Sequence, residues 1–314
     1  MKHVGALALL LLGAPGAHAV DRGFARNAAA YLDVAAGARA IGMGRAQASV
    51  VPHDASALLA NPAQLPLLSA HSLATNSGAM GENRTLHSVG YVLPFRLKYQ
   101  GWSMGQQHMP LALGAGITSF KVGGIESRDE FGLKQDAFTN TENAYYFSFA
   151  IQSTSRFSFG ATGKLLTHKI QTTQADGQAF DIGSWYRLPQ TSYGQFDVSF
   201  LVRDFKGDLV WKVHDDNLNI DSEYTESVIT KYVIAAAYAP NPKWRFAADF
   251  IQSRELNPLL HVGVEWEAYP RFFVRTGVSA YDPTFGFGYL LGLGSTNIAI
   301  DYAFQYGLDS PANT

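Results

Sequence analysis

Glycine, aspartate and asparagine stand close together in residues 37–65, a segment otherwise rich in alanine. Gly42-x-Gly44 could begin a dinucleotide-binding loop, but the third glycine and the flanking strand and helix that such a loop needs are missing. The chain also has no P-loop, no Gly-x-Ser-x-Gly nucleophile elbow, no His-Glu-x-x-His motif and no cysteine. The common phosphate-binding, hydrolase and thiolate sites are therefore excluded.

Two histidines, His168 and His261, lie on predicted strands. A lipid hydrolase would need one of them beside a serine near a lipid-facing rim. His261 shares a strand face with Glu265, which favours a structural hydrogen bond or ion pair over catalysis. The acidic segment 205–227 could offer oxygens to Ca²⁺, but its spacing matches no EF-hand loop, and a solvated outer loop is expected. We predict no enzyme, catalytic residue, cofactor or metal site; a barrel lipid hydrolase is a remote alternative.

Composition and the first residues indicate an exported protein. Of the 314 residues, 16% are charged and 13% aromatic, and the net charge of −2 argues against a nucleic-acid partner. Lys2, an apolar run and small residues at Ala17 and Ala19 form a signal peptide over residues 1–19. The apolar run is too short for a membrane-spanning helix, which needs about 20 residues.

Alternation of apolar and polar residues dominates the rest of the chain. Tyr145 and Phe147 share one face of a segment whose other face carries Tyr146 and Ser148, which is the period of a β-strand. Most such segments have the ~9–11 residues that a tilted strand needs to cross a bilayer. They lie near residues 70–77, 86–93, 110–120, 143–152, 156–168, 178–188, 194–204, 228–239, 244–253, 258–267, 271–281, 285–293 and 296–306.

Charges of both signs fall on one face of these segments, in the middle of the strands. A barrel in lipid turns its apolar face outward and its polar face inward, and closure pairs the backbone groups that hydrocarbon cannot satisfy. We therefore predict an all-β fold, an antiparallel transmembrane β-barrel of 12–14 strands over residues 69–306, against the alternative of a secreted soluble all-β protein. The predicted lumen-facing polar residues are Asp181, Arg187, Asp197, Arg203, Lys231, Asp249, Glu265, Arg275 and Asp301.

The lengths of the connections between strands predict how the barrel is oriented in the membrane, and they leave open whether its number of strands is even. Short turns alternate with longer loops at 121–142 and 205–227, as in outer-membrane barrels with long extracellular loops. The last segment then runs outward and leaves a tail at 307–314 outside. Because single-chain bacterial barrels have an even strand count, either one early segment is misassigned or a closing strand is missing.

Residues 20–68 are predicted to form a partly helical hatch inside the lumen, against the alternative of a soluble cap or linker. Asp54 can cap a short helix over residues 55–60, which Pro62 ends by biasing Asn61 out of helical geometry. So short a helix needs support from its surroundings, and small side chains allow close approach inside a narrow lumen. The predicted hatch and gating residues are Gly42, Gly44, Asp54, Asn61, Pro62 and Ala63.

The same segment resembles the N-terminal signature of the FadL-like outer-membrane proteins, particularly the PorV/PorQ-like branch. The resemblance lies in GARAIGMG at 37–44, DASALL at 54–59 and NPA at 61–63, with later likenesses at 179–183, 263–266, 275–277 and 300–303. It implies a monomeric barrel of about fourteen strands with an N-terminal hatch in the lumen. The chain is shorter than many relatives and lacks the usual final strand with a terminal aromatic residue.

Two functions follow as expectations for a protein of the bacterial outer membrane, embedded in its lipid. The chain transports a hydrophobic, fatty-acid-like small molecule through a hatch-gated barrel. Alternatively, it is a PorV/PorQ-like component of a secretion or surface-assembly system, with secretion-system or cargo proteins as its partners.

Overall fold

The computed structural model describes residues 27–34, 36–100, 106–129, 131–215, 220–294 and 296–307. The predicted signal peptide and residues 308–314 of the predicted tail lie outside these ranges. Among the described residues, no helix has both the length and the apolar character required to cross a membrane.

Fourteen strands form one antiparallel sheet, so the predicted fold class is confirmed. Every segment in which the sequence alternates overlaps a strand of the structure. The strands are β1 (Ser72–Met80), β2 (Arg84–Gln100), β3 (Gln106–Ile125), β4 (Phe138–Thr154), β5 (Phe157–Ile170), β6 (Thr173–Arg187), β7 (Gln195–Asp215), β8 (Ile220–Ser227), β9 (Lys231–Asn241), β10 (Trp244–Gln252), β11 (Leu259–Tyr269), β12 (Phe272–Ser279), β13 (Asp282–Leu293) and β14 (Thr296–Gln305).

The order of the sheet explains the question of strand number. β7 pairs with β9 along its first half and with β8 along its second half, so β8 and β9 occupy one position interrupted at residues 228–230. The hydrogen-bonded path from β1 to β14 consequently has thirteen positions. With an odd number of antiparallel positions, β1 and β14 run in the same direction. Among the described residues these two edge strands are not paired with one another, and the sheet is not closed.

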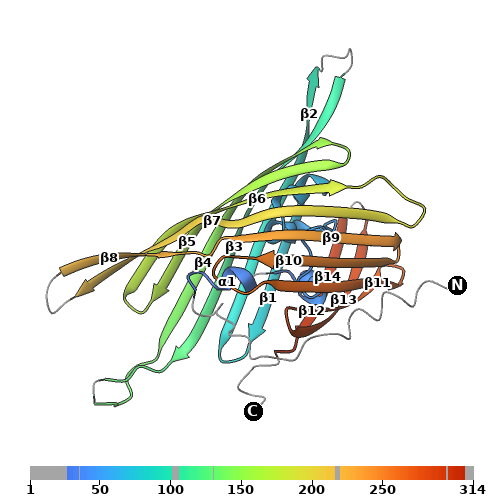
Figure 1. Cartoon of the computed structure of the whole chain (residues 1–314). Coiled ribbons are helices and arrows are strands. Elements are labelled where there is room, and N and C mark those ends of the chain that lie inside the picture. Colours follow the sequence, from blue (N-terminus) through green and yellow to red (C-terminus); the bar gives the residue numbers. More distant parts are fainter. Residues whose placement is uncertain are drawn as a thin grey trace.

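One predicted loop is wrong in part. Residues 205–227 were expected to be solvated loop, but β7 continues to Asp215 and pairs with β8 in register from Asp208↔Ser227 to Asp215↔Ile220. Cross-strand contact of Trp211 with Tyr224, whose rings lie 6.0 Å apart, supports this hairpin despite its acidic residues. Figure 1 shows β7 and β8 extending together beyond the neighbouring strands. The predicted loop at residues 121–142 is also shorter in the structure, because β3 continues to Ile125 and β4 begins at Phe138.

The N-terminal segment, here residues 27–71, contains only short helices. These are α1 (Tyr31–Val34), α2 (Ala38–Gly42) and the 3-10 helices η3 (Ala55–Leu59) and η4 (Pro62–Leu67). Figure 1 shows them enclosed by the strands. The helix predicted at 55–60 is thus a 3-10 helix, and a second one follows it after Asn61. Short 3-10 turns suit a segment whose backbone is held by side chains of the wall.

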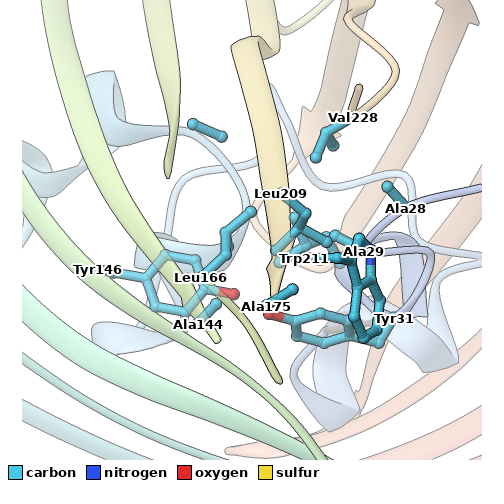
Figure 2. Packing of buried hydrophobic residues seen from close by; sticks show 12 residues of the cluster. Ala28, Ala29, Tyr31, Ala144, Tyr146, Leu166, Ala175, Leu209, Trp211 and Val228 are labelled. Carbon is cyan, nitrogen blue, oxygen red and sulfur yellow. The ribbon is translucent and has the colours of Figure 1, made fainter. Parts of the chain in front are cut away.

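The face of the sheet that the N-terminal segment contacts is called the inner face. Along β9 buried and exposed residues alternate strictly from Lys231 to Ala237, as the period of two requires. At one place Ala28, Ala29 and Tyr31 pack against residues of β4 to β7, including Leu166 and Trp211, as Figure 2 shows. The buried core of the molecule therefore lies between the N-terminal segment and the wall.

Candidate functional site

The turn at Met43 and Gly44 fits against glycines of the wall. A Cβ atom at Gly277 would lie 2.5 Å from Gly44 N, and one at Gly263 would lie 2.2 Å from Met43 O. Gly44 has a φ of +60°, and a Cβ there would lie 2.5 Å from Val262 O. Backbone meets backbone at this point, which only glycine permits. Gly44 N also donates to Thr284 Oγ1 at 2.9 Å.

Glycines also receive the second half of the N-terminal segment. A Cβ at Gly183 would lie 2.2 Å from Asn61 Oδ1, and one at Gly160 would lie 2.8 Å from the carbonyl carbon of Pro62. The Leu58 side chain would lie 2.4 Å from a Cβ at Gly114. Each of these glycines removes a side chain from the inner face where the segment approaches. The wall is thus shaped for this segment.

A hydrogen-bonded clamp holds the loop at residues 47–50 from two sides. Gln64 Nε2 donates to the carbonyl oxygens of Gln47, Ala48 and Val50 at 3.1, 2.9 and 2.9 Å. From the wall, Asp249 Oδ2 accepts from the backbone N–H groups of Gln47 and Ala48, both at 3.0 Å. This clamp satisfies backbone groups that would otherwise be buried without a partner.

Asn61, a predicted gating residue, joins the same clamp. Its Nδ2 donates to Ala48 O at 2.9 Å and to Ser184 O at 3.3 Å, and its Oδ1 accepts from Ala63 N at 3.0 Å. Asn61 is therefore both the cap of η4 and a link between the loop and the wall. Gln64 was not among the residues predicted from the sequence; its place in η4 two residues after Pro62 offered no chemical signal.

Replacing Gln64 by leucine should destabilise the protein by about 1–3 kcal/mol. Leucine has a similar size but no donor, so the Val50 carbonyl would stay buried without its bond, while the Gln47 carbonyl would keep only its bond from Val50 N. The measurement is the midpoint of denaturant unfolding in detergent micelles. Gln178→Leu, at an exposed position of β6, is the matched control. Equal midpoints for the two variants would show that the clamp contributes nothing.

The remaining predicted hatch residues lie in the same segment. The Asp54 side chain accepts from Ser56 N at 2.8 Å, which is the predicted capping bond. Gly42 ends α2 against Gly286, and Ala63 is fully buried with its carbonyl oxygen accepting from Ser158 Oγ at 2.5 Å. The structure brings these residues together along the inner face. Whether they gate a pathway stays a prediction.

Glu265 lies at the centre of a buried charge cluster. Arg39 donates to both of its carboxylate oxygens at 2.8 Å, and Arg275 Nε donates to Oε2 at 2.8 Å. Arg245 also pairs with Glu265, and Arg275 Nη1 reaches Asp301 Oδ1 at 2.5 Å. Burial lowers the pKa of Arg39, but the charge and hydrogen bonds of Glu265 outweigh it and hold that pKa above its ordinary value. Arg39 thereby ties the N-terminal segment to the wall.

A second cluster surrounds Asp204. Lys164 Nζ contacts Asp181 at 2.8 Å and Asp204 at 2.7 Å, while Lys231 Nζ contacts Asp204 at 3.4 Å and Asp33 at 2.5 Å. Asp33 belongs to the N-terminal segment, so this cluster also joins segment and wall.

The other predicted lumen-facing residues are also engaged. Arg203 Nη2 donates to the carbonyl oxygens of Leu59 and Ala60 at 2.5 and 3.1 Å. Arg187 forms two hydrogen bonds with the Asp197 carboxylate, at 2.9 and 3.0 Å. The charges of the inner face thus bind one another or the N-terminal segment. Sequence reasoning missed Arg39, although it is the only charged residue of the 37–44 stretch and so did give a signal.

Two cavities flank the clamp. The first, of about 350 Å³, has a mostly apolar surface to which Val34, Ala40, Leu59, Val233, Ile251, Leu256 and Leu259 contribute. Its polar members include Asp33, Arg45, Gln47, Arg203, Lys231, Asp249, Asn257, His261, Asp282 and Gln305. The second, of about 310 Å³, is more polar and is lined by Val51, Pro66, Leu68, Arg96, Trp185 and Arg187, among others. β10, β12 and β14 end beside the first cavity, whereas β4 and β6, which run the opposite way, end beside the second. The cavities therefore lie toward opposite rims.

The layer between the cavities is the clamp itself. Ser49, Val50, Asn61 and Gln64 are completely buried and line neither cavity. Trp185 Nε1 donates to Ser49 O at 3.1 Å and fixes this layer to β6.

Large apolar side chains cover the outer face of the sheet. Phe147 is 59% exposed, Ile182 54% and Ile300 59%. They lie on β4, β6 and β14, so the apolar surface extends over strands that are far apart in the sheet. Exposed apolar surface on this scale exceeds what soluble monomers show and indicates contact with lipid. Aromatic rings of Phe196, Tyr238, Phe246, Trp244 and Trp266 form a stacked row there.

Comparison with known proteins identifies the fold. No family model matches the sequence, and no curated protein matches it. The toluene transporter TodX of Pseudomonas putida aligns with a TM-score of 0.52 and 14% identity, covering 87% of this chain and 92% of that one. A Pseudomonas aeruginosa FadL homologue aligns with a TM-score of 0.51 and 11% identity, covering 85% and 88%. At such identities the likeness extends to the fold alone.

Proposed function

We propose that the protein lies in a bacterial outer membrane and passes a small hydrophobic molecule across it, with the N-terminal segment as its hatch. The observation that carries the proposal is the apolar cavity of about 350 Å³ that borders the clamp. A dry apolar cavity of about 150 Å³ can already bind benzene, so this one has room for a larger apolar molecule. Most of its surface is apolar, with polar and charged side chains set among the apolar ones, as in sites for apolar ligands.

The arrangement of the two cavities supports a gated path. A molecule entering the first cavity meets the layer of Asn61, Gln64 and residues 47–50, with the second cavity on its far side. The glycines of the wall fit the N-terminal segment by shape, and the two charge clusters hold the same segment by ion pairs of Arg39 and Asp33. Opening requires local rearrangement of a short segment and leaves the strands in place. Structures similar to this one in fold include proteins described as a toluene transporter and a monoaromatic hydrocarbon channel.

The test is uptake of radiolabelled toluene and of a radiolabelled long-chain fatty acid by a Gram-negative host without its own channels for them. We expect the parent protein to raise uptake of at least one compound above an empty-vector strain. Asn61→Ala, which removes the bonds to Ala48 and Ser184, should change that rate several-fold.

Asn241→Ala is the matched control, because Asn241 is exposed at the end of β9 and its side chain accepts a local hydrogen bond from Lys243 N. It should leave uptake unchanged. The transport proposal would be wrong if the parent protein, present in normal amounts and folded in the membrane, took up neither compound faster than the empty-vector strain.

The hairpin of β7 and β8 favours a second candidate, a PorV/PorQ-like role in protein secretion or surface assembly. It projects past the sheet and exposes Tyr224 and acidic side chains such as Glu223. This role predicts that deleting residues 210–225 abolishes export of a cargo protein while uptake of small molecules stays at background.

A further inference from the structure

A groove of about 880 Å³ runs along the outer face of β2 to β7. Its walls are large apolar side chains, among them Phe147, Phe149 and Ile182. Its floor is low because Ala115, Ala161 and Gly163 carry little or no side chain there. On a face that contacts lipid, a groove with such a lining takes hydrocarbon chains.

One cation lies at the groove, on an irregular part of β7. Pairing between β6 and β7 shifts register on both sides of Phe180, so that its partner is Phe205. Asp204 and Lys206 both have left-handed backbone conformations, with φ of +56° and +50°. Such values are uncommon for residues other than glycine and are kept where the surroundings enforce them.

The irregularity turns two neighbouring charges to opposite faces. Asp204 is buried on the inner face with Lys164 and Lys231, whereas Lys206 is exposed beside the groove with its Nζ 5.6 Å from the Phe205 ring centre. Asp181, the acidic residue at the groove, is buried and paired with Lys164, so its charge is neutralised from within. Among the residues that the structure describes along this groove, the walls are therefore apolar and Lys206 is the one charge without an opposite partner.

We propose that this groove binds a membrane lipid with an anionic phosphate head group, whose acyl chains lie on Ala115 and Ala161 and whose phosphate contacts Lys206. A lysine facing lipid costs free energy unless it reaches the interface or meets an anion. Binding of an anionic lipid meets both demands at once. The proposal requires the chain to be in a membrane but does not depend on what it transports.

The test is native mass spectrometry of the delipidated protein in detergent, titrated with phosphatidylglycerol or with phosphatidylcholine of the same acyl chains. One lysine near a membrane surface is worth about 1 kcal/mol toward an anionic lipid, so the parent should bind phosphatidylglycerol about fivefold more tightly. Lys206→Gln should remove this preference. Lys212→Gln, an exposed lysine of the same strand beyond the groove, should keep it.

A second pair of variants tests the groove itself. Ala161→Trp fills it and should weaken binding of both lipids several-fold, whereas Ala236→Trp, at an exposed alanine of β9 outside the groove, should not. An unchanged preference in Lys206→Gln, or equal effects of the two tryptophans, would overturn the proposal in favour of unspecific lipid contact. Loss of toluene uptake in Ala161→Trp with lipid binding intact would also overturn it, and would make the groove a lateral outlet.

Discussion

Alanine at Gly277 is expected to expel the turn at Met43 and Gly44 from its place on the wall. The new Cβ would lie 2.5 Å from Gly44 N, 2.5 Å from Val262 O and 2.6 Å from the Met43 carbonyl carbon. All three are backbone atoms, which cannot swing aside as a flexible side chain would. Overpacking usually costs about 1–3 kcal/mol, and a clash with three backbone atoms belongs at the upper end or beyond. The strands can persist while the N-terminal segment detaches.

The absence of cysteine makes this detachment measurable. A single reporter, Ala46→Cys, stands at a completely buried position and should react slowly with a maleimide in the parent protein. Adding Gly277→Ala should raise the labelling rate at least tenfold. Gly163→Ala is the matched control, because its Cβ would meet only the Phe180 ring at an ordinary 3.8 Å. Equal protection of the reporter in both variants would refute the fit of the segment to the wall.

Glutamine at Glu265 is expected to destabilise the protein by about 3–5 kcal/mol. Glu265 is 2% exposed and compensates Arg39, Arg245 and Arg275 together. Glutamine keeps the shape but not the charge, so three guanidinium groups would lose their shared carboxylate, and Asp301 would still pair with Arg275. Removing one partner of a buried ion pair leaves the other charge uncompensated, which is the costly case.

Denaturant unfolding followed by the fluorescence of the five tryptophans measures this loss. Arg187→Gln breaks a pair in which the arginine is 38% exposed, and it should cost at most about 1 kcal/mol. The double variant Glu265→Gln, Arg245→Gln should recover part of the stability, because it removes one of the excess charges. A single variant as stable as Arg187→Gln would mean that Glu265 does not hold the cluster.

Most of the strands were predictable from the alternation of apolar and polar residues. In β4 Tyr145, Phe147 and Phe149 are exposed, whereas Tyr146, Ser148 and Ala150 between them are buried, so the strand and its two faces were both predictable. The odd number of strand positions was also visible in the sequence. The β7–β8 hairpin escaped because Asp208, Glu223 and Glu226 break the pattern, while pairing of Trp211 with Tyr224 depends on a register that periodicity does not encode.

The site was predictable in location but not in its contacts. Asp54 and Asn61 carry capping chemistry that acts over a few residues, and both do cap the elements that follow them. Gln64 and Arg39 act through partners brought close only by the complete sheet. The isolated charge of Arg39 marks it in the sequence, but no local rule identifies its partner Glu265. Gly263 and Gly277 are the points at which a second layer of backbone approaches the strands, and nothing in their local sequence distinguishes them from other strand glycines.

The contacts that hold the N-terminal segment also order the steps of folding. Arg39 and Glu265 are 226 residues apart, and Gly44 and Thr284 are 240 apart. Their partners belong to β11 and β13, near the far end of the sheet order, so the segment cannot lock until those strands have formed. Contacts of such separation also make folding slow. Docking of this segment is then the last step of folding. It can occur only when β11 and β13 have paired in the correct register, because a shifted register would misplace Glu265 and Thr284.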